Sequence, residues 1–269
     1  MGVFAGGQSE VTGNRVYSND IGIQTGNYGF GGRIINNVIY DSEVAAVALG
    51  NGLPGSVLEF NTIHEPVADG ITVHQGSNGV SIKNNIVSVG AGIAIQVELG
   101  SESSLHSDYN LFDIHGTAKF AKWVGYDVPD LLTWSQRLGL DVHSLVENPQ
   151  FVDANGADNR LGYDATTGTD YSDDDEFHLL PSSPGIDRAN PFAWYLSEPT
   201  PNGNRANIGA YGNTPWATSS PQRLVQVLSP NGHEKLEAES ETRITWQTAG
   251  VTTRQPVALM NVGGGSVAY

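Results

Sequence analysis

An asparagine recurs five times at nearly constant spacing in the first 110 residues of this 269-residue chain. The successive gaps are 23, 24, 24 and 25 residues, and the surrounding letters are alike: VTGNRVY, IINNVIY, LEFNTIH, IKNNIVS and SDYNLF. The five residues are Asn14, Asn37, Asn61, Asn85 and Asn110. A fixed period of this length means that one structural unit is copied along the chain, so the unit limits what the chain can fold into.

Apolar residues occupy fixed positions around each asparagine. Three residues before it stand Val11, Ile34, Leu58 and Ile82, and two residues after it stand Val16, Ile39, Ile63 and Val87. A second apolar pair follows: Ile21 and Ile23, Val44 and Val47, Ile71 and Val73, Ile93 and Ile95, with Gly22, Thr72 and Ala94 expected to face outward between them. Steps of two and β-branched side chains are typical of strands. We therefore expect an all-β fold, a parallel β-helix of about five coils, each burying its apolar edge against the next.

The asparagine column has two interpretations. Identical side-chain amides stacked along a β-helix can hydrogen-bond to one another and to turn backbone groups, which forms a ladder. Alternatively, asparagine is common at turns because it tolerates the left-handed conformation. The fixed position of the asparagines relative to the apolar columns favours the ladder.

Composition narrows the classes of function. The chain has 29 acidic and 13 basic residues, a net charge of −16 and no cysteine. These values disfavour nucleic acid and anionic membranes as partners and exclude a disulfide framework. Because no run of about 18 apolar residues occurs, we expect no membrane span. The first residues, MGVFAGGQSEVTGN, lack the basic and apolar regions of a signal peptide, so we expect the chain to be a piece of a longer protein.

After Asn110 the repeat stops, and residues 130–139 are expected to form a short helix between a capping Asp130 and Gly139. The segments SDYNLF, TWSQRLGLDVHSLVENPQFVD, FHLLPSSPGID and EPTPNGNRANIGAYGNT resemble the C-terminal part of bacterial right-handed parallel β-helix repeat proteins of the pectate-lyase-like superfamily. The resemblance covers roughly residues 10–218 and implies a right-handed β-helix, export, and an extracellular or cell-surface location. From the repeat we expect coils over residues 1–110, and because a β-helix end must be covered, we expect C-terminal coils with a loop-rich cap over residues 111–218.

The last part of the chain, residues 222–269, alternates apolar and polar residues after a Ser/Pro-rich linker. The segment SPNGHEKLEAESETRITW resembles the start of an Ig-like module that follows such β-helices. Because a β-sandwich needs about 100 residues, we expect a partial, truncated sandwich. One face of its sheet is expected to carry Val225, Val227, Ile244, Trp246, Val257 and Leu259.

The catalytic and substrate-binding candidates are outward-facing polar residues. Lyases on this fold pair a cation that neutralises a uronate with a basic residue that removes a proton. Lys83, a catalytic candidate, stands in the same column as Glu59, a substrate-binding candidate. The two can equally form a surface ion pair. A second column is expected to hold Gln24, Ala48, His74 and Gln96, with Glu98 beyond it; His74 is the candidate base, and Gln24, Gln96 and Glu98 are candidates for sugar binding. The alternative is a solvated polar face.

The metal and aromatic candidates lie in the cap. Asp173, Asp174 and Asp175 can hold Ca²⁺ as a candidate cofactor, although they lack the spacing of a calcium loop, and the alternative is a solvated loop. Trp134 is expected on the apolar face of the short helix, packed in the core of the protein. Aromatic residues expected in loops, where they can stack on sugars, are Trp123, Tyr126, Trp194 and Tyr195.

These observations favour an exported protein that binds or cleaves an extracellular polysaccharide. If it is an enzyme, the resemblance implies a polysaccharide lyase, which acts by β-elimination, or a glycoside hydrolase. The alternative is a non-catalytic surface stalk or adhesin module, because a fold hosts many functions. In either case we expect a monomeric piece of a larger multidomain protein whose partner is a polysaccharide and not nucleic acid.

Overall fold

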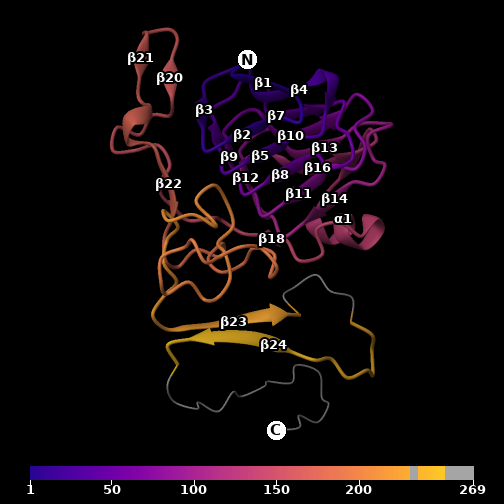
Figure 1. Cartoon of the computed structure of the whole chain (residues 1–269), viewed down its shortest axis with the longest axis vertical. Helices are drawn as coiled ribbons and strands as arrows, with labels where there is room; N and C mark the ends of the chain where they lie inside the picture. The colour runs from indigo at the N-terminus through magenta and orange to yellow at the C-terminus, as the bar shows by residue number, and fades with distance from the viewer. Residues whose placement is uncertain (231–235, 252–269) are drawn as a thin grey trace.

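The structure of this chain, a computed structural model, describes residues 1–230 and 236–251. Short strands of successive coils pair in parallel and form three sheets that surround one apolar core (Figure 1). We call these sheets A, B and C. About five coils stack in this way, as the repeat predicts.

Sheet B carries the apolar column that precedes the asparagines. Ile34 pairs with Val11 and Leu58, and Leu58 pairs with Ile82. All four side chains are buried, so the predicted interior file is confirmed. In spatial order the strands are β14 (His106–Asp108), β11 (Ser81–Lys83), β8 (Val57–Glu59), β5 (Arg33–Ile35) and β2 (Glu10–Thr12).

Sheet C carries the column that follows the asparagines. Val16, Ile39, Ile63 and Val87 pair in sequence and are buried, and the column continues into Phe112. The strands are β18 (Leu145–Val146), β15 (Leu111–Ile114), β12 (Ile86–Val89), β9 (Thr62–Glu65), β6 (Val38–Tyr40) and β3 (Arg15–Tyr17).

Sheet A is the largest sheet, and an antiparallel strand ends it. Its inward columns include Ile23, Val47, Ile71 and Ile95, which lie in register. The strands are β1 (Val3–Gly7), β4 (Ile21–Phe30), β7 (Ala45–Gly50), β10 (Asp69–His74), β13 (Ile93–Val97), β16 (Lys119–Trp123) and the antiparallel β17 (Tyr126–Val128).

The corner where the chain enters sheet A differs from the prediction. Gly22 and Ala94 face inward and are buried, because a side chain at Gly22 would lie 2.5 Å from Ile39 Cγ2 and 2.7 Å from the carbonyl of Ala46. Val44 precedes β7 and is 59% exposed, so its assignment to the core is wrong. Strict alternation fails here because the chain bends, and only small residues fit the inside of the bend.

The five asparagines form a hydrogen-bonded ladder. Asn37 Nδ2 donates to Asn61 Oδ1 at 2.9 Å, and the Asn37 backbone N–H donates to the same oxygen at 3.0 Å. The same pair of bonds joins each asparagine to the next as far as Asn110. The left-handed conformation occurs one residue earlier, at Gly13, Asn36, Phe60, Asn84 and Tyr109. The ladder asparagines therefore serve as hydrogen-bonding groups, and their neighbours make the turn.

A short helix closes the C-terminal end of the coils. Helix α1 (Leu131–Leu138) begins after Asp130, whose Oδ1 accepts the Thr133 N–H at 2.7 Å, and ends at Gly139 with a φ of 71°. Trp134 is fully buried against Phe120 and Trp123. Its Nε1 donates to Asp141 Oδ2 at 2.9 Å. The helix thus covers the last coil, as a β-helix end requires.

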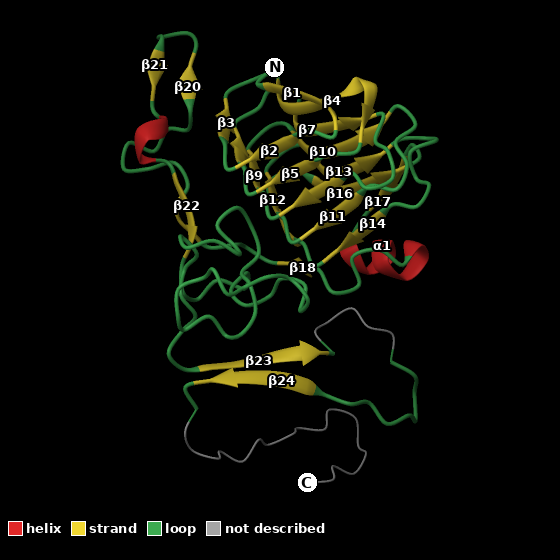
Figure 2. Cartoon of the chain, viewed as in Figure 1, coloured by secondary structure: helices red, strands yellow, loops and turns green. Residues whose placement is uncertain are grey.

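The rest of the cap runs back along the outside of sheets B and C. Phe177 packs against Tyr40 at 4.8 Å between ring centroids, and Arg15 of the first coil donates to the carbonyl of Ser172 at 3.0 Å. Most of the segment between β22 and β23 is loop (Figure 2). Its short elements are β19 (Phe151–Asp153), β20 (Tyr163–Asp164), β21 (Thr169–Asp170), the 3₁₀ turn η1 (Ser172–Asp174) and β22 (Glu176–Leu179).

The described part of the tail is one antiparallel pair, β23 (Leu224–Ser229) and β24 (Thr245–Ala249). Val225, Val227 and Trp246 are exposed on it, while Gln226 is buried and donates to the carbonyl of Ile186 at 3.1 Å. Val257 and Leu259 of the predicted apolar face lie outside the described residues. In the described ranges no helix is long and apolar enough to cross a membrane.

Candidate functional site

The outer face of sheet A carries a continuous column of side chains, one from each of its parallel strands. The register joins Phe4, Gln24, Ala48, Thr72, Gln96 and Lys122. Neighbouring strands of a sheet lie about 4.8 Å apart, so these side chains form a row along the axis of the β-helix. Amides and hydroxyls both donate and accept hydrogen bonds, and a lysine donates only. The row can therefore bind a polar, hydroxyl-rich chain and can hold an anionic group at its Lys122 end.

The predicted column is wrong at His74. The register pairs His74 with Gly50, and Thr72 takes the place between Ala48 and Gln96. Ile71, not Val73, aligns with Ile23 and Ile95, so matching the apolar pairs shifts this repeat by two residues. A constant step of 24 residues from Gln24 would have identified Thr72.

His74 and Glu98 instead share the next outward column. The Glu98 N–H donates to the carbonyl of Val73 at 2.9 Å, which sets Glu98 beside His74. Burial lowers the pKa of His74, and the Glu98 carboxylate opposes that shift. The His74 Nε2 is buried and has no hydrogen-bond partner among the described residues. A neutral imidazole beside a carboxylate can accept a proton, as a base must.

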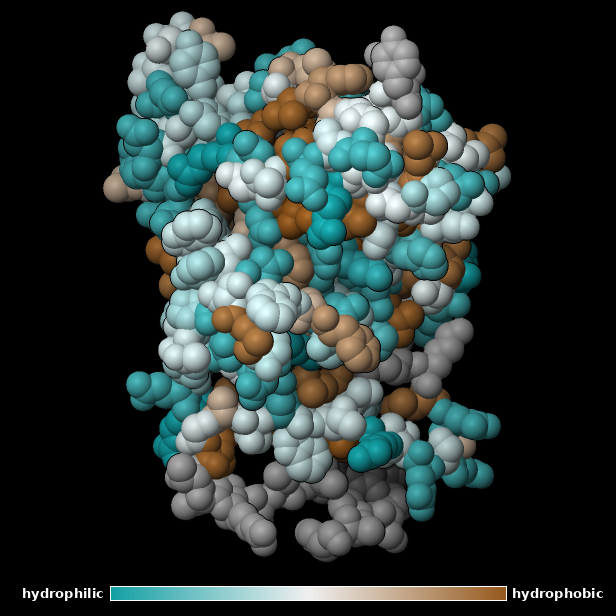
Figure 3. Space-filling model, viewed as in Figure 1, coloured by the Kyte–Doolittle hydropathy of each residue, from teal (hydrophilic) through white to brown (hydrophobic). Residues whose placement is uncertain are grey.

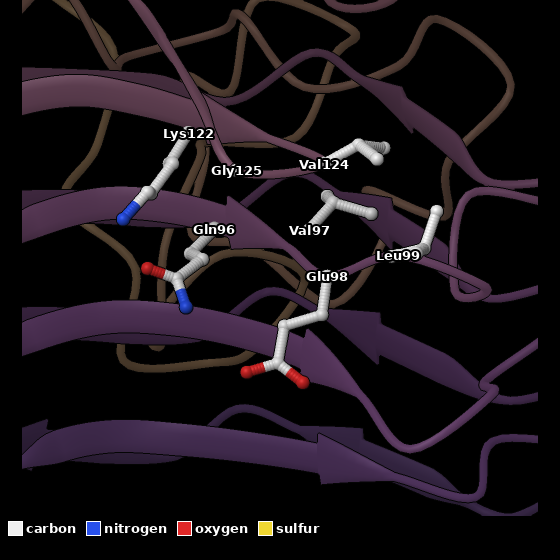
Figure 4. A pocket seen from close by; sticks show the side chains of 7 residues that line it. All are labelled: Gln96, Val97, Glu98, Leu99, Lys122, Val124 and Gly125. Atoms are coloured by element: carbon white, nitrogen blue, oxygen red, sulfur yellow. The ribbon is translucent and has the colours of Figure 1, made fainter.

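A hollow of about 400 Å³ opens at the end of this face, beside the turn between β16 and β17. Gln96, Glu98 and Lys122 line it with their polar groups on the same side of the sheet (Figure 4). Lys122 follows Gln96 in the column by 26 residues, a spacing that sequence reasoning missed because the asparagine repeat ends before it.

Aromatic rings lie at the same end of the β-helix. Trp123 and Tyr126 line a second hollow of about 220 Å³ with Arg137, between β17 and α1. Both residues lie in strands, not in loops as predicted, and Tyr126 is 77% exposed. Trp194 is exposed in the cap, whereas Tyr195 packs against the second apolar cluster. An exposed tyrosine ring can stack on a sugar.

The second catalytic candidate lies on a different sheet. Lys83 is on β11 of sheet B, in register with Glu59 and Asp108, while His74 is on β10 of sheet A. Burial raises the pKa of Glu59, and the Asn84 amide donates to its Oε1 at 2.8 Å. The structure therefore does not bring Lys83 and His74 together, and it separates Glu59 from Gln24, Gln96 and Glu98.

The candidate metal ligands lie in and just after η1, and backbone N–H groups donate to the carboxylates of Asp174 and Asp175. Asp174 Oδ2 accepts the Ala157 N–H at 2.8 Å, and Asp175 Oδ2 accepts the Gly162 N–H at 3.0 Å. Asp173 and Asp174 are exposed, and Asp175 is buried. Over residues 1–230 and 236–251, no group of three or more His, Asp or Glu side chains is placed to hold a metal ion. Calcium binding at Asp173, Asp174 and Asp175 stays a prediction.

The surface in Figure 3 is mixed, with hydrophilic side chains interspersed among smaller apolar areas.

The sequence of the coils matches a known family: residues 1–124 match the model of a family described as right handed beta helix region. Neither a curated protein nor a solved structure matches this chain significantly. Together with the parallel sheets, this match shows that the coils of the chain have the fold of a right-handed parallel β-helix.

Proposed function

We propose that this protein is exported and binds an extracellular polysaccharide along the outer face of sheet A. The observation that carries the proposal is the row Gln24, Thr72, Gln96 and Lys122, which lies in register on successive coils with only Ala48 between. A sugar chain laid along the axis of the β-helix would meet a hydrogen-bonding side chain on four of the six parallel strands, the exceptions being Phe4 and Ala48. Because the row repeats with the coils, its spacing is as rigid as the core beneath it.

An acidic polysaccharide fits the C-terminal end of the row best. Lys122 supplies a positive charge there, and Lys119 extends from the same strand, where it pairs with Asp127 at 2.7 Å. Charge-assisted hydrogen bonds to carboxylates are about twice as strong as neutral ones. The exposed ring of Tyr126 adds an apolar surface for a sugar face.

We propose binding without cleavage. β-Elimination needs a base and a charge-neutralising cation within hydrogen-bond reach of one sugar unit. Lys83 and His74 lie on different sheets, so these two candidates cannot act together on one sugar unit. This arrangement supports recognition of hydroxyl and carboxylate groups more than proton abstraction.

Affinity electrophoresis in gels containing pectate, alginate or chondroitin tests the proposal. Retardation by at least one of them is expected, and the double substitution Gln96→Ala with Lys122→Ala should weaken binding by about tenfold or more, because one neutral and one charge-assisted hydrogen bond are lost. Lys83→Ala on sheet B is the matched control and should bind like the unmodified protein.

Two results would overturn the proposal: no retardation by any of the three polysaccharides, or equal binding by the double variant. Incubation of the same polysaccharides with and without calcium, followed by ultraviolet absorbance, should give no unsaturated product. Appearance of that product would replace binding by β-elimination as the function.

A non-catalytic stalk or adhesin module is the second candidate. The continuous stack of coils, and the antiparallel pair β23 and β24 that follows the cap, favour it, because together they form an elongated spacer that an Ig-like module would extend. Figure 1 draws β23 and β24 beyond the cap, at the opposite end from the N-terminus. If the protein is a stalk, none of the polysaccharides should retard it in the gel. The same experiment therefore distinguishes the two candidate functions.

A further inference from the structure

Two arginines share a small pocket in this strongly acidic chain. Arg188 and Arg205 of the cap line a cavity of about 180 Å³, together with Tyr109 and His143 at the end of the β-helix and Ser229 at the end of β23. The chain has only 13 basic residues and a net charge of −16. In a chain with so few basic residues, two positive charges that line one cavity stand out as a candidate site for an anion.

Neither guanidinium group forms an ion pair in the part of the chain that the structure describes. Within residues 1–230 and 236–251, Arg188 Nε is buried without a hydrogen-bond partner. Arg205 donates to the carbonyls of Ala189 and, at 3.1 Å, of Arg188. Because backbone carbonyls are uncharged, these bonds hold Arg205 in place without neutralising its charge.

Burial and mutual repulsion both act on this pair. Burial lowers the pKa of Arg188 and of Arg205, and the charge of Arg188 lowers the pKa of Arg205 further. Acidic groups oppose these shifts: Glu147 raises the pKa of Arg188, and Tyr109, followed by Asp187, raises the pKa of Arg205. Two desolvated cations near each other are costly unless an anion lies between or beside them.

The aromatic wall gives the pocket a fixed shape. The rings of Tyr109 and His143 stack with centroids 4.8 Å apart and an angle of 4°, and the Arg205 guanidinium lies 5.8 Å from the Tyr109 ring. His143 Nδ1 lies 2.8 Å from Asp108 Oδ2, which orients the imidazole. Stacking and this hydrogen bond hold the wall rigid, so the arginines are presented to a small ligand at little cost in entropy.

We propose that this pocket binds an oxyanion, a carboxylate, sulfate or phosphate group, through Arg188 and Arg205. The planar guanidinium fork matches the oxygen geometry of these groups. A volume of about 180 Å³ accepts a single anionic group or one acidic sugar unit. The site involves none of the residues of the sheet A row, so it is independent of the function proposed above.

Isothermal titration calorimetry at constant ionic strength tests the proposal with sodium glucuronate, sulfate and phosphate, and with glucose as the uncharged control. Saturable binding of at least one anion and no binding of glucose are expected. The anion that binds most tightly distinguishes an acidic sugar from an inorganic or phosphorylated ligand. Arg188→Gln should weaken binding by about tenfold or more, the range expected when a charged hydrogen-bonding partner is removed.

Arg33→Gln is the matched control, because Arg33 is a half-exposed arginine on sheet B whose nearest acid, Glu10, lies 3.8 Å away. It should bind the anion like the unmodified protein, and so should the Gln96→Ala, Lys122→Ala variant.

Arginine modification by phenylglyoxal, followed by mass spectrometry, is a second measurement that needs no variant. The bound anion should slow modification of Arg188 and leave Arg33 unchanged. Any one of three results would overturn the proposal: none of the three anions binds saturably, Arg188→Gln binds the anion with unchanged affinity, or the anion does not protect Arg188 from modification.

Discussion

Each interior ladder asparagine satisfies several buried backbone groups at once. Asn61 Nδ2 donates to the carbonyls of Ile34 and Glu59, and Asn61 Oδ1 accepts both the backbone and the side-chain N–H of Asn37. Asn61 is fully buried. Backbone groups at a buried turn have no access to water, so the amide replaces it.

We predict that Asn61→Ala lowers the free energy of unfolding by about 2–4 kcal/mol, because more than one buried group loses its partner. Asn14→Ala, at the exposed start of the ladder, removes fewer buried contacts and should cost about 1 kcal/mol or less. Urea denaturation of both variants checks this. Equal losses at the two positions would contradict a structural role for the interior amides.

Glu65 is a buried carboxyl with one unsatisfied oxygen. Its Oε2 accepts the Ser42 N–H at 2.6 Å, and its Oε1 has no partner among the described residues. Burial raises its pKa from 4.5 to about 8, against the opposing effect of the Ser42 hydrogen bonds. Between these two values the unfolded chain has lost the proton while the folded chain keeps it. Glu65 therefore costs stability progressively as the pH rises through that window.

We predict that Glu65→Gln gains stability relative to the unmodified protein between about pH 5 and about pH 8, by more than about 1.4 kcal/mol, the equivalent of one pKa unit. The neutral amide keeps an acceptor for Ser42 and does not ionise. Urea unfolding at several pH values measures the difference, with Glu43→Gln, at an exposed neighbouring site, as the control. A difference that is constant with pH would show that Glu65 ionises normally in the folded state.

At the scale of elements, α1 joins the core to the end of the ladder. Trp134 fills the open end of the apolar core and holds Asp141, whose Oδ1 accepts from Asn110 Nδ2 at 2.8 Å. Burial raises the pKa of Asp141, while its hydrogen bonds, including those from Ser107 and Ser144, oppose the shift. The last asparagine thus ends on a buried carboxyl, and the helix holds that carboxyl in place.

Replacing Trp134 with Ala should cost about 3–5 kcal/mol of stability, because a large cavity opens and Asp141 loses a donor. Leu132→Ala lies on the same helix with a side chain that is 44% exposed, and it should cost about 1 kcal/mol or less. Thermal denaturation followed by circular dichroism compares the two. Similar melting temperatures for both variants would mean that α1 does not seal the core.

The spiral of coils could be predicted from the sequence, because it follows from a local period. The columns of Val11 and Val16 need only the asparagine spacing, and the helix between Asp130 and Gly139 needs only its capping residues. The pattern misplaces His74 because Asp69 stands where the first repeat has Ile21, so the apolar pair Ile71 and Val73 lies two residues later in its coil than Ile21 and Ile23. Contacts such as Arg15 with Ser172 join residues 157 apart, and no periodicity indicates them.

At the scale of the whole molecule, the three sheets have different partners. The cap crosses sheets B and C, where Asn36 Nδ2 donates to the carbonyl of Ala210 and the Gly209 N–H donates to the carbonyl of Asn84. The described cap makes these contacts on the side of the β-helix away from the row that contains Gln24 and Gln96. The proposed binding face is therefore a long row of polar groups on a rigid sheet, separate from the proposed arginine pocket between the cap and the end of the β-helix.

Lysine footprinting tests the binding face most directly. Lys83 on sheet B and Lys122 on sheet A are both half-buried, so their rates of acetylation by N-hydroxysuccinimidyl acetate can be compared with and without polysaccharide by mass spectrometry. Saturating pectate, alginate or chondroitin should slow the modification of Lys122 several-fold and leave Lys83 unchanged. Protection of Lys83 with Lys122 still fully reactive would contradict binding along the outer face of sheet A.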